Sequence, residues 1–177
     1  MLRFLLPLAL LSLPALAQGQ TRHDTNAPID FGADQIQLQD RANRAVLTGN
    51  VSVKQAEMTL NAARMTVAYT GEVVGGNPQV SRLDASGGVT VRRPQQTAQS
   101  QYAVYDLGRR VITMAGAVKL TQGGGNTVNG GRLTIDLDTG RATIDGAAAR
   151  GGPALPGGVV QNPRGRVTGT FSVPDRK

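Results

Sequence analysis

Apolar and polar residues alternate along the chain from residue 29 to residue 146, in short runs separated by turn residues. No stretch shows the period of 3.6 residues that is typical of an amphipathic helix. A period of two places successive side chains on opposite faces of a strand, so the pattern predicts roughly ten or eleven β-strands. We therefore expect an all-β protein whose sheet has one apolar face and one polar face.

Three glycines, Gly49, Gly87 and Gly116, interrupt the alternation in the middle of predicted strands. Each is followed two residues later by a valine, and the pattern returns at intervals of about 30 to 38 residues, which is typical of stacked supersecondary units. A glycine inside a strand marks a bulge or a tight bend. We expect these three to bend long strands at one level, giving an open, V-shaped roll. The alternative, that they are ordinary turn residues ending short strands, gives the same inner face.

The apolar members of the alternating runs are expected to face the inside of this roll. Only 3% of the residues are aromatic, so the inner face is built from aliphatic side chains and methionine. The residues expected to line it are Ile36, Leu38, Leu47, Val51, Val53, Leu60, Met65, Val67, Val89, Val91, Val104, Ile112, Met114, Val118, Leu133, Ile135 and Ile144. Between the strands, DLGRR at 106–110 and DLDTGR at 136–141 are expected to be hairpin turns whose glycine takes a positive φ.

The two ends of the chain differ from the repeating region. Residues 1–17 combine a basic start, an apolar run and a small-x-small ending, the three parts of a cleavable signal peptide. A membrane anchor is the alternative, but the run is shorter than a bilayer span and contains two prolines. We expect a linker at 18–27, the roll at 28–146, and a mobile tail rich in Gly, Pro and Arg at 147–177, in which 167–174 could add a short strand.

The charge and the cysteine content indicate where the protein works and which kind of partner it binds. The chain has no cysteine, so it must fold without disulfides, which suits an exported protein of a Gram-negative periplasm. The net charge of +7 favours anionic partners. We do not expect nucleic acid to be one of them, because the signal predicts an exported protein. Eight arginines near predicted strand ends could orient a phosphate or a membrane surface, or could simply form a solvated face: Arg41, Arg44, Arg64, Arg82, Arg92, Arg93, Arg109 and Arg110.

Candidate chemistry is sparse. The single histidine, His23, lies in the expected linker and has no partner at a spacing that indicates catalysis. DLDTG at 136–140 lacks the further ligands of a calcium loop, and the glycine-rich stretch at 123–131 lacks the ending of a phosphate-binding loop. A glycan-acting enzyme would need paired carboxylates, for which Asp136 and Asp138 are the remote candidates. We expect no enzyme, no metal and no cofactor.

Residues 27–67, APIDFGADQIQLQDRANRAVLTGNVSVKQAEMTLNAARMTV, resemble the LptA/OstA-like family of periplasmic lipopolysaccharide-transport proteins. SQYAVYDLGRRVITMAGAVKL at 100–120 resembles the family's second copy, and VNGGRLTIDLDTGRATI at 128–144 its closing hairpin. Gly116-Ala117 departs from the Gly-Asn of the first copy.

The resemblance implies an open, V-shaped β-jellyroll that carries lipopolysaccharide, with the acyl chains of lipid A in its groove. It also implies head-to-tail stacking into a bridge between an LptC-like inner-membrane protein and an LptD-like outer-membrane protein. The cleavable signal argues against the chain being LptC itself, and the lack of a large C-terminal barrel argues against LptD. A hypothesis of another class is a structural β-roll that binds proteins through its edges and carries no lipid.

Overall fold

The structure is a computed structural model that describes residues 23–71, 76, 78–146 and 167–170. In these residues it contains ten β-strands and one short 3-10 turn, η1(Asp40–Ala42), and no helix long and apolar enough to cross a membrane. The prediction of an all-β protein is confirmed. The strands are β1(Ile29–Gly32), β2(Gln35–Gln39), β3(Arg44–Gln55), β4(Met58–Thr70), β5(Gln79–Arg93), β6(Gln96–Asp106), β7(Val111–Gln122), β8(Thr127–Asp136), β9(Ala142–Asp145) and β10(Thr168–Thr170).

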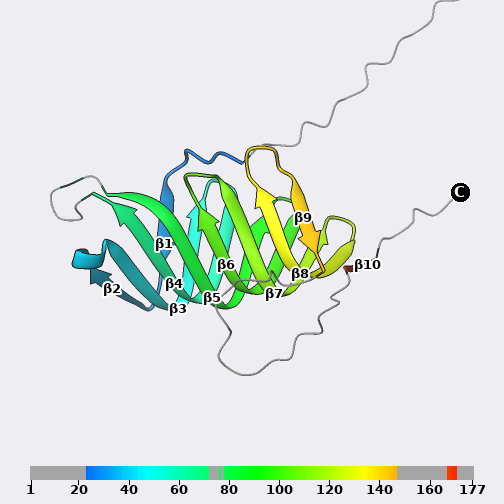
Figure 1. Cartoon of the computed structure of the whole chain (residues 1–177), viewed down its shortest axis with the longest axis horizontal. Coiled ribbons are helices and arrows are strands. Elements are labelled where there is room, and N and C mark those ends of the chain that lie inside the picture. The colour runs from blue at the N-terminus through cyan, green and yellow to red at the C-terminus, as the bar shows by residue number, and fades with distance from the viewer. Residues whose placement is uncertain (1–22, 72–75, 77, 147–166, 171–177) are drawn as a thin grey trace, which may run out of the picture.

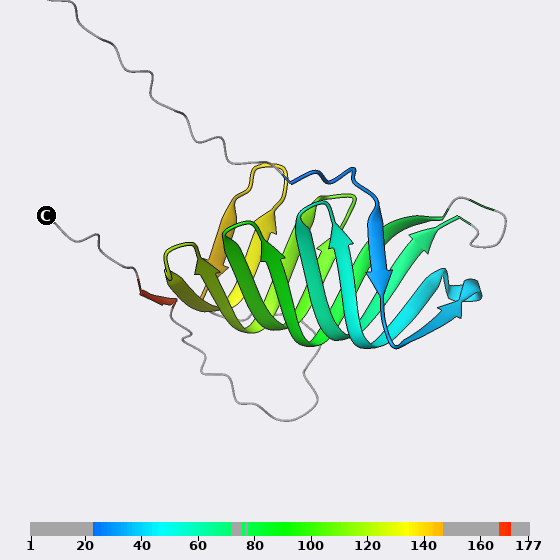
Figure 2. The same cartoon turned by 180° about the vertical axis from the view of Figure 1, so that it is seen from behind.

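The strands form one antiparallel sheet whose order follows the chain. Each strand from β3 to β8 pairs with the next in sequence, while β1 and β2 both pair with β3. At the other end, β9 and β10 both pair with β8. Figure 1 and Figure 2 show the strands side by side along the long axis of the molecule, with β2 and β10 at opposite ends. This arrangement is the β-jellyroll that the sequence predicted.

Each of the long strands β3, β5 and β7 bends at two consecutive residues with positive φ. The pairs begin with Gly49, Gly87 and Gly116, at φ of 77°, 84° and 84°, and they continue with Asn50, Gly88 and Ala117. The pairing register between neighbouring strands shifts at each of these places. Because the glycines lie inside strands, they are not turn residues that end them. An extra residue in a ladder bends the strand, so aligned bends fold the sheet along one line.

The bends divide the sheet into two facing walls, which we call the first and the second wall. The register fixes the membership of each wall. The first wall consists of 44–48 of β3, 64–70 of β4, 79–86 of β5, 102–106 of β6, 111–115 of β7 and 132–136 of β8, with β2 and β9 at its ends. The second wall consists of 51–55 of β3, 58–62 of β4, 89–93 of β5, 96–100 of β6, 118–122 of β7 and 127–130 of β8, with β1 and β10 at its ends.

The inner faces of the two walls pack against each other in a single core. Leu47, Met65, Met114 and Leu133 are fully buried there. Each such side chain contributes about 1.5 to 3 kcal/mol relative to an exposed one. The space between the walls is therefore filled by the protein's own side chains over most of its length.

The hairpin between β6 and β7 differs from the sequence prediction in one detail. Gly140 takes the expected positive φ of 70° in its turn, but at 106–110 the residue with positive φ is Arg110, at 55°, and not Gly108. Asp106 accepts a hydrogen bond from the Arg109 amide at 2.9 Å, and the Arg110 amide donates to the Leu107 carbonyl. The loop between the paired residues Asp106 and Val111 therefore has four residues, and the left-handed residue is the last of them.

Candidate functional site

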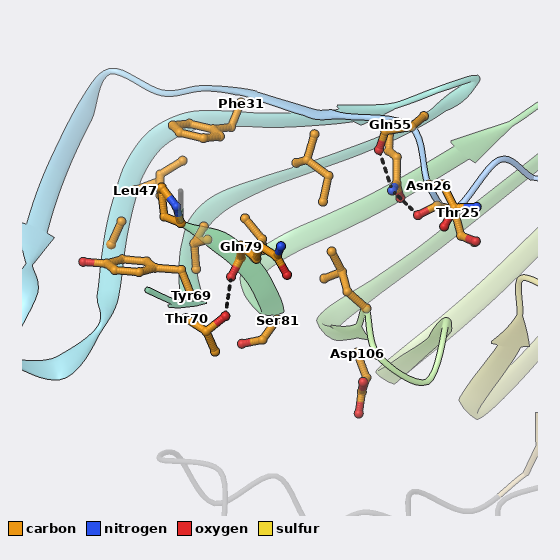
Figure 3. Close-up of a pocket in the computed structure, with 18 of the residues that line it drawn as sticks. Thr25, Asn26, Phe31, Leu47, Gln55, Tyr69, Thr70, Gln79, Ser81 and Asp106 are labelled. Atoms are coloured by element: carbon orange, nitrogen blue, oxygen red, sulfur yellow. Dashed lines mark hydrogen bonds between the residues drawn. The ribbon is translucent and has the colours of Figure 1, made fainter. Parts of the chain in front are cut away.

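A cavity of about 940 Å³ opens at the β1–β2 end of the roll, where the two walls are not packed together. Figure 3 shows it from within the roll, with Phe31, Leu47, Gln55 and Tyr69 around it. Its lining comes from both walls, from the segment before β1 and from the β6–β7 turn. The lining residues are Thr25, Asn26, Ala27, Ile29, Phe31, Leu38, Ala45, Leu47, Gln55, Val67, Tyr69, Thr70, Pro78, Gln79, Val80, Ser81, Asp106, Leu107 and Gly108.

The floor of the cavity and part of its rim are apolar, while Asn26, Gln79 and Asp106 are among the polar residues that complete the lining. Leu47 and Val67 at its floor belong to the buried core, so the cavity continues into the inner face. At its rim, Phe31 and Leu38 are 51% and 54% exposed. They face inward because the register pairs Phe31 with Val53 and Leu38 with Ala45, both of which are buried. Exposed apolar side chains gathered at one opening indicate a binding surface.

A buried polar cluster borders the cavity on one side. The Gln55 side chain is only 2% exposed, and its Nε2 donates to the carbonyl oxygens of Thr25 and Ala27, each at 3.0 Å (Figure 3). Its Oε1 accepts a hydrogen bond from the Tyr105 hydroxyl at 2.8 Å, and Nε2 of His23 lies 3.3 Å from the same oxygen. A buried amide is stable only when its donors and acceptors are satisfied, and here all of them have partners.

Burial raises the pKa of Tyr105 to about 12, although Arg110 and the hydrogen bond with Gln55 act in the opposite direction. The folded protein therefore holds the phenol proton more tightly than the unfolded chain, whose tyrosine has a pKa near 10. Between pH 10 and pH 12 the unfolded state binds fewer protons, so the free energy of unfolding should fall as the pH rises. Urea denaturation across this range measures the fall.

The Tyr105→Phe variant is the control for this titration. Burial and the nearby Asp40 also raise the pKa of Tyr69, so the variant should lose part of the alkaline destabilisation and keep the rest. An unchanged pH profile in the variant would contradict the assignment to Tyr105.

Comparison with known proteins places the chain in a family. Residues 31–141 match the sequence profile described as LptA/(LptD N-terminal domain) LPS transport protein. The chain belongs to this LptA/LptD family. It is also 30% identical to the uncharacterized protein R00383 of Rhizobium meliloti (strain 1021) over 151 residues, which are 80% of this chain and 81% of that protein.

The LptA-like fold also appears in a solved structure. LptH, the LptA-homologous periplasmic component of the lipopolysaccharide transport device of Pseudomonas aeruginosa, matches with a TM-score of 0.65. The match covers 85% of this chain and 99% of LptH at 20% sequence identity. At that identity the likeness establishes a shared fold.

Most of the residues that the sequence assigned to the inner face of this LptA-like roll are buried between the walls. Their contact with lipid stays a prediction. Ile144 is partly buried against the core. Fully within the core are Leu47, Val51, Val53, Leu60, Met65, Val67, Val89, Val91, Ile112, Met114, Val118, Leu133 and Ile135.

Val104 was wrongly assigned to the inner face. In β6, Ser100 and Ala103 are both buried although they are three residues apart, because the bend inserts one extra residue and reverses the alternation. Beyond the bend the buried residues are therefore Ala103 and Tyr105, and Val104 lies on the outer face opposite Thr113.

Ile36 and Leu38 share the inner face but are not covered. Ile36 pairs with the buried Leu47, yet it is 45% exposed. Both residues are on β2, an edge strand at the open end of the roll, where Phe31 of β1 at the end of the second wall is exposed as well. These two residues therefore face inward, as expected, but they are not enclosed between the walls.

The sequence analysis missed the polar part of the site in this family member. His23, Thr25 and Ala27 lie in the expected linker, but in the structure they border the cavity or bond to Gln55. Gln55 was not assigned to the inner face, although its place in the alternation, two residues after Val53, is an inner position. That position was the available signal.

Charged residues on the outer surface form ion pairs and turn hydrogen bonds with nearby residues. Arg82 pairs with Asp84 at 2.7 Å and Arg110 with Asp138 at 3.1 Å, and all four side chains are largely exposed. Hydrogen bonds from Thr139 lower the pKa of Asp136, as expected for a turn carboxylate. Asp136 and Asp138 therefore serve the hairpin and an ion pair. Within the described part of the chain, no group of three or more acidic or imidazole side chains could hold a metal.

Proposed function

We propose that this chain is a periplasmic lipopolysaccharide carrier that shields acyl chains between the walls of its roll. The observation that supports this most directly is the cavity at the β1–β2 end, whose apolar floor continues into the inner face of a fold shared with LptH. Export by a cleavable segment at 1–17 belongs to the same proposal, and these residues lie outside the described part of the chain.

Magnitudes favour the apolar surface as the source of lipid affinity. Burial of an acyl chain contributes about 0.8 kcal/mol per CH₂. An exposed ion pair contributes about 0 to 1 kcal/mol, so the outer arginines could orient a phosphorylated headgroup but could not hold the lipid. Transfer between the grooves of two stacked rolls would change the hydrocarbon's exposure little, which suits a bridge of head-to-tail copies between LptC-like and LptD-like partners.

A structural β-roll without lipid cargo is the second candidate. The packed interior favours it, because most of the space between the walls is already filled by buried side chains. The two candidates differ in whether lipid reaches the cavity in a folded protein.

Site-specific photo-crosslinking tests this difference. A photoreactive amino acid at Phe31, which faces the cavity and is half exposed, should form adducts with lipopolysaccharide in cells. The same residue at Asp30, the neighbour on the outer face of β1, should not. Both positions are solvent-accessible, so the folded structure should tolerate both substitutions. Equal adducts at the two sites, or none at Phe31 in an exported and folded protein, would favour the scaffold.

A further inference from the structure

One hydrogen bond joins the two walls of the roll directly. Gln55 is the last residue of β3 in the second wall, and Tyr105 is in the part of β6 that belongs to the first wall. The Tyr105 hydroxyl donates to Gln55 Oε1 at 2.8 Å in a buried environment. We propose that Gln55, Tyr105 and the segment 23–27 form a clasp that holds the roll closed and opens to admit an acyl chain. This proposal rests on the carrier function.

The clasp couples the segment before β1 to the closure of the walls. The same Gln55 amide that accepts the Tyr105 bond donates to the carbonyls of Thr25 and Ala27. His23 adds a further contact to the shared oxygen. Because these bonds converge on one side chain, displacement of Gln55 frees the segment and breaks the hydrogen bond between the walls in a single step.

The position of the clasp makes it a gate. Thr25, Ala27 and Gln55 line the cavity, and behind them the inner face consists of the buried side chains of the core. A chain that enters deeper must separate the walls. Hydrocarbon can replace the apolar contacts that are lost, but it offers no partner for the Tyr105 hydroxyl or the Gln55 amide. Water must hydrate these groups in the open state, so the clasp resists opening while the apolar surfaces permit it.

A pair of tyrosine variants isolates the clasp. Tyr105→Phe removes only the hydroxyl that bridges the walls. Tyr102→Phe is the matched control, because Tyr102 is on the same strand as Tyr105 but is 38% exposed and does not line the cavity. Since the chain has no cysteine, spin labels can be placed at Lys54→Cys and Arg109→Cys, which are exposed on the second wall and at the edge of the first.

Two readouts are measured on the full-length mature protein. The first is the distance distribution between the spin labels, which should broaden toward longer distances in Tyr105→Phe and stay unchanged in Tyr102→Phe. The second is the rate of uptake of lipopolysaccharide that carries a fluorescent acyl chain, which should rise at least threefold in Tyr105→Phe alone.

The outcomes separate the clasp from the carrier function. Equal distances and equal uptake rates in the two variants would overturn the clasp and leave the carrier function standing. A broadened distance in Tyr105→Phe without uptake by any form, wild type included, would overturn the carrier function and the gating role together. Gln55→Leu provides a second check, because it should also speed hydrogen exchange of the amides at 23–27, and unchanged exchange there would contradict the coupling.

Discussion

Replacing Gly87 with alanine is expected to lower the free energy of unfolding by about 3 kcal/mol, because two costs add at this bend. The residue has a φ of 84°, which an alanine adopts at a cost of about 1 to 2 kcal/mol. In addition, the new Cβ would lie 2.7 Å from Cβ of Ala63 on the neighbouring strand, well inside ordinary carbon contact. Neither atom is at the end of a flexible side chain, so the backbone of β4 or β5 must move.

The adjacent Gly88 provides the control for this effect. Its φ is 74°, but nothing lies within 4 Å of a Cβ placed there, so Gly88→Ala should cost only about 1 kcal/mol. The double variant Gly87→Ala with Ala63→Gly removes the close contact and should recover much of the difference. Chemical denaturation of the wild type, the two single variants and the double variant measures these changes in the free energy of unfolding. Equal losses at Gly87 and Gly88 would show that the φ strain alone matters and that the two strands can separate freely at the bend.

Leu38→Asp is expected to reduce the uptake of lipopolysaccharide at least tenfold while the protein stays folded. Leu38 lines the cavity and is more than half exposed, so the carboxylate can stay hydrated in the empty protein. Surface substitutions of this kind change stability by about 0.5 kcal/mol or less. An acyl chain entering the cavity would strip water from the charge, which is unfavourable by far more than an apolar contact contributes.

Ile36→Asp is the matched variant for this experiment. Ile36 lies on the same strand and the same face with similar exposure, but it does not line the cavity. Uptake of fluorescent lipopolysaccharide, measured together with thermal unfolding, should fall at position 38 much more than at position 36. A similar decrease at both positions would indicate general repulsion between the new charge and the anionic lipid, and normal uptake by Leu38→Asp would mean that lipid enters elsewhere.

The alternation and the glycine spacing predicted the fold because both act locally. Period two assigns a face to each residue of a strand, and a glycine pattern that repeats places the bends at one level. The same local rule failed at Val104, where an extra residue in β6 reverses the phase without a glycine to mark it. Nothing in the neighbouring sequence records that insertion, because it follows from the bend of the strands on either side.

The inner position of Gln55 could be predicted, but its contacts could not, for a different reason. Gln55 and Tyr105 are 50 residues apart and belong to different walls, and they meet only after the sheet folds on itself. The segment 23–27 has the composition of a linker, and it contributes backbone carbonyls to the cluster, which carry no residue-type signal. The exposure of Leu38 likewise depends on which strands are present at the end of the roll.

The order of the sheet has a consequence for how the protein folds. From β3 to β8 every strand pairs with its neighbour in the chain, so each hairpin closes a short loop and none of these pairings waits for a distant segment. Folding rates of β-proteins are limited mainly by the closure of long loops, and this topology avoids most of them. The wall can therefore grow one hairpin at a time as the chain emerges, with each finished hairpin serving as the template for the next. Among the described strands, only β10 must wait for a segment beyond residue 166, from which it returns to pair with β8.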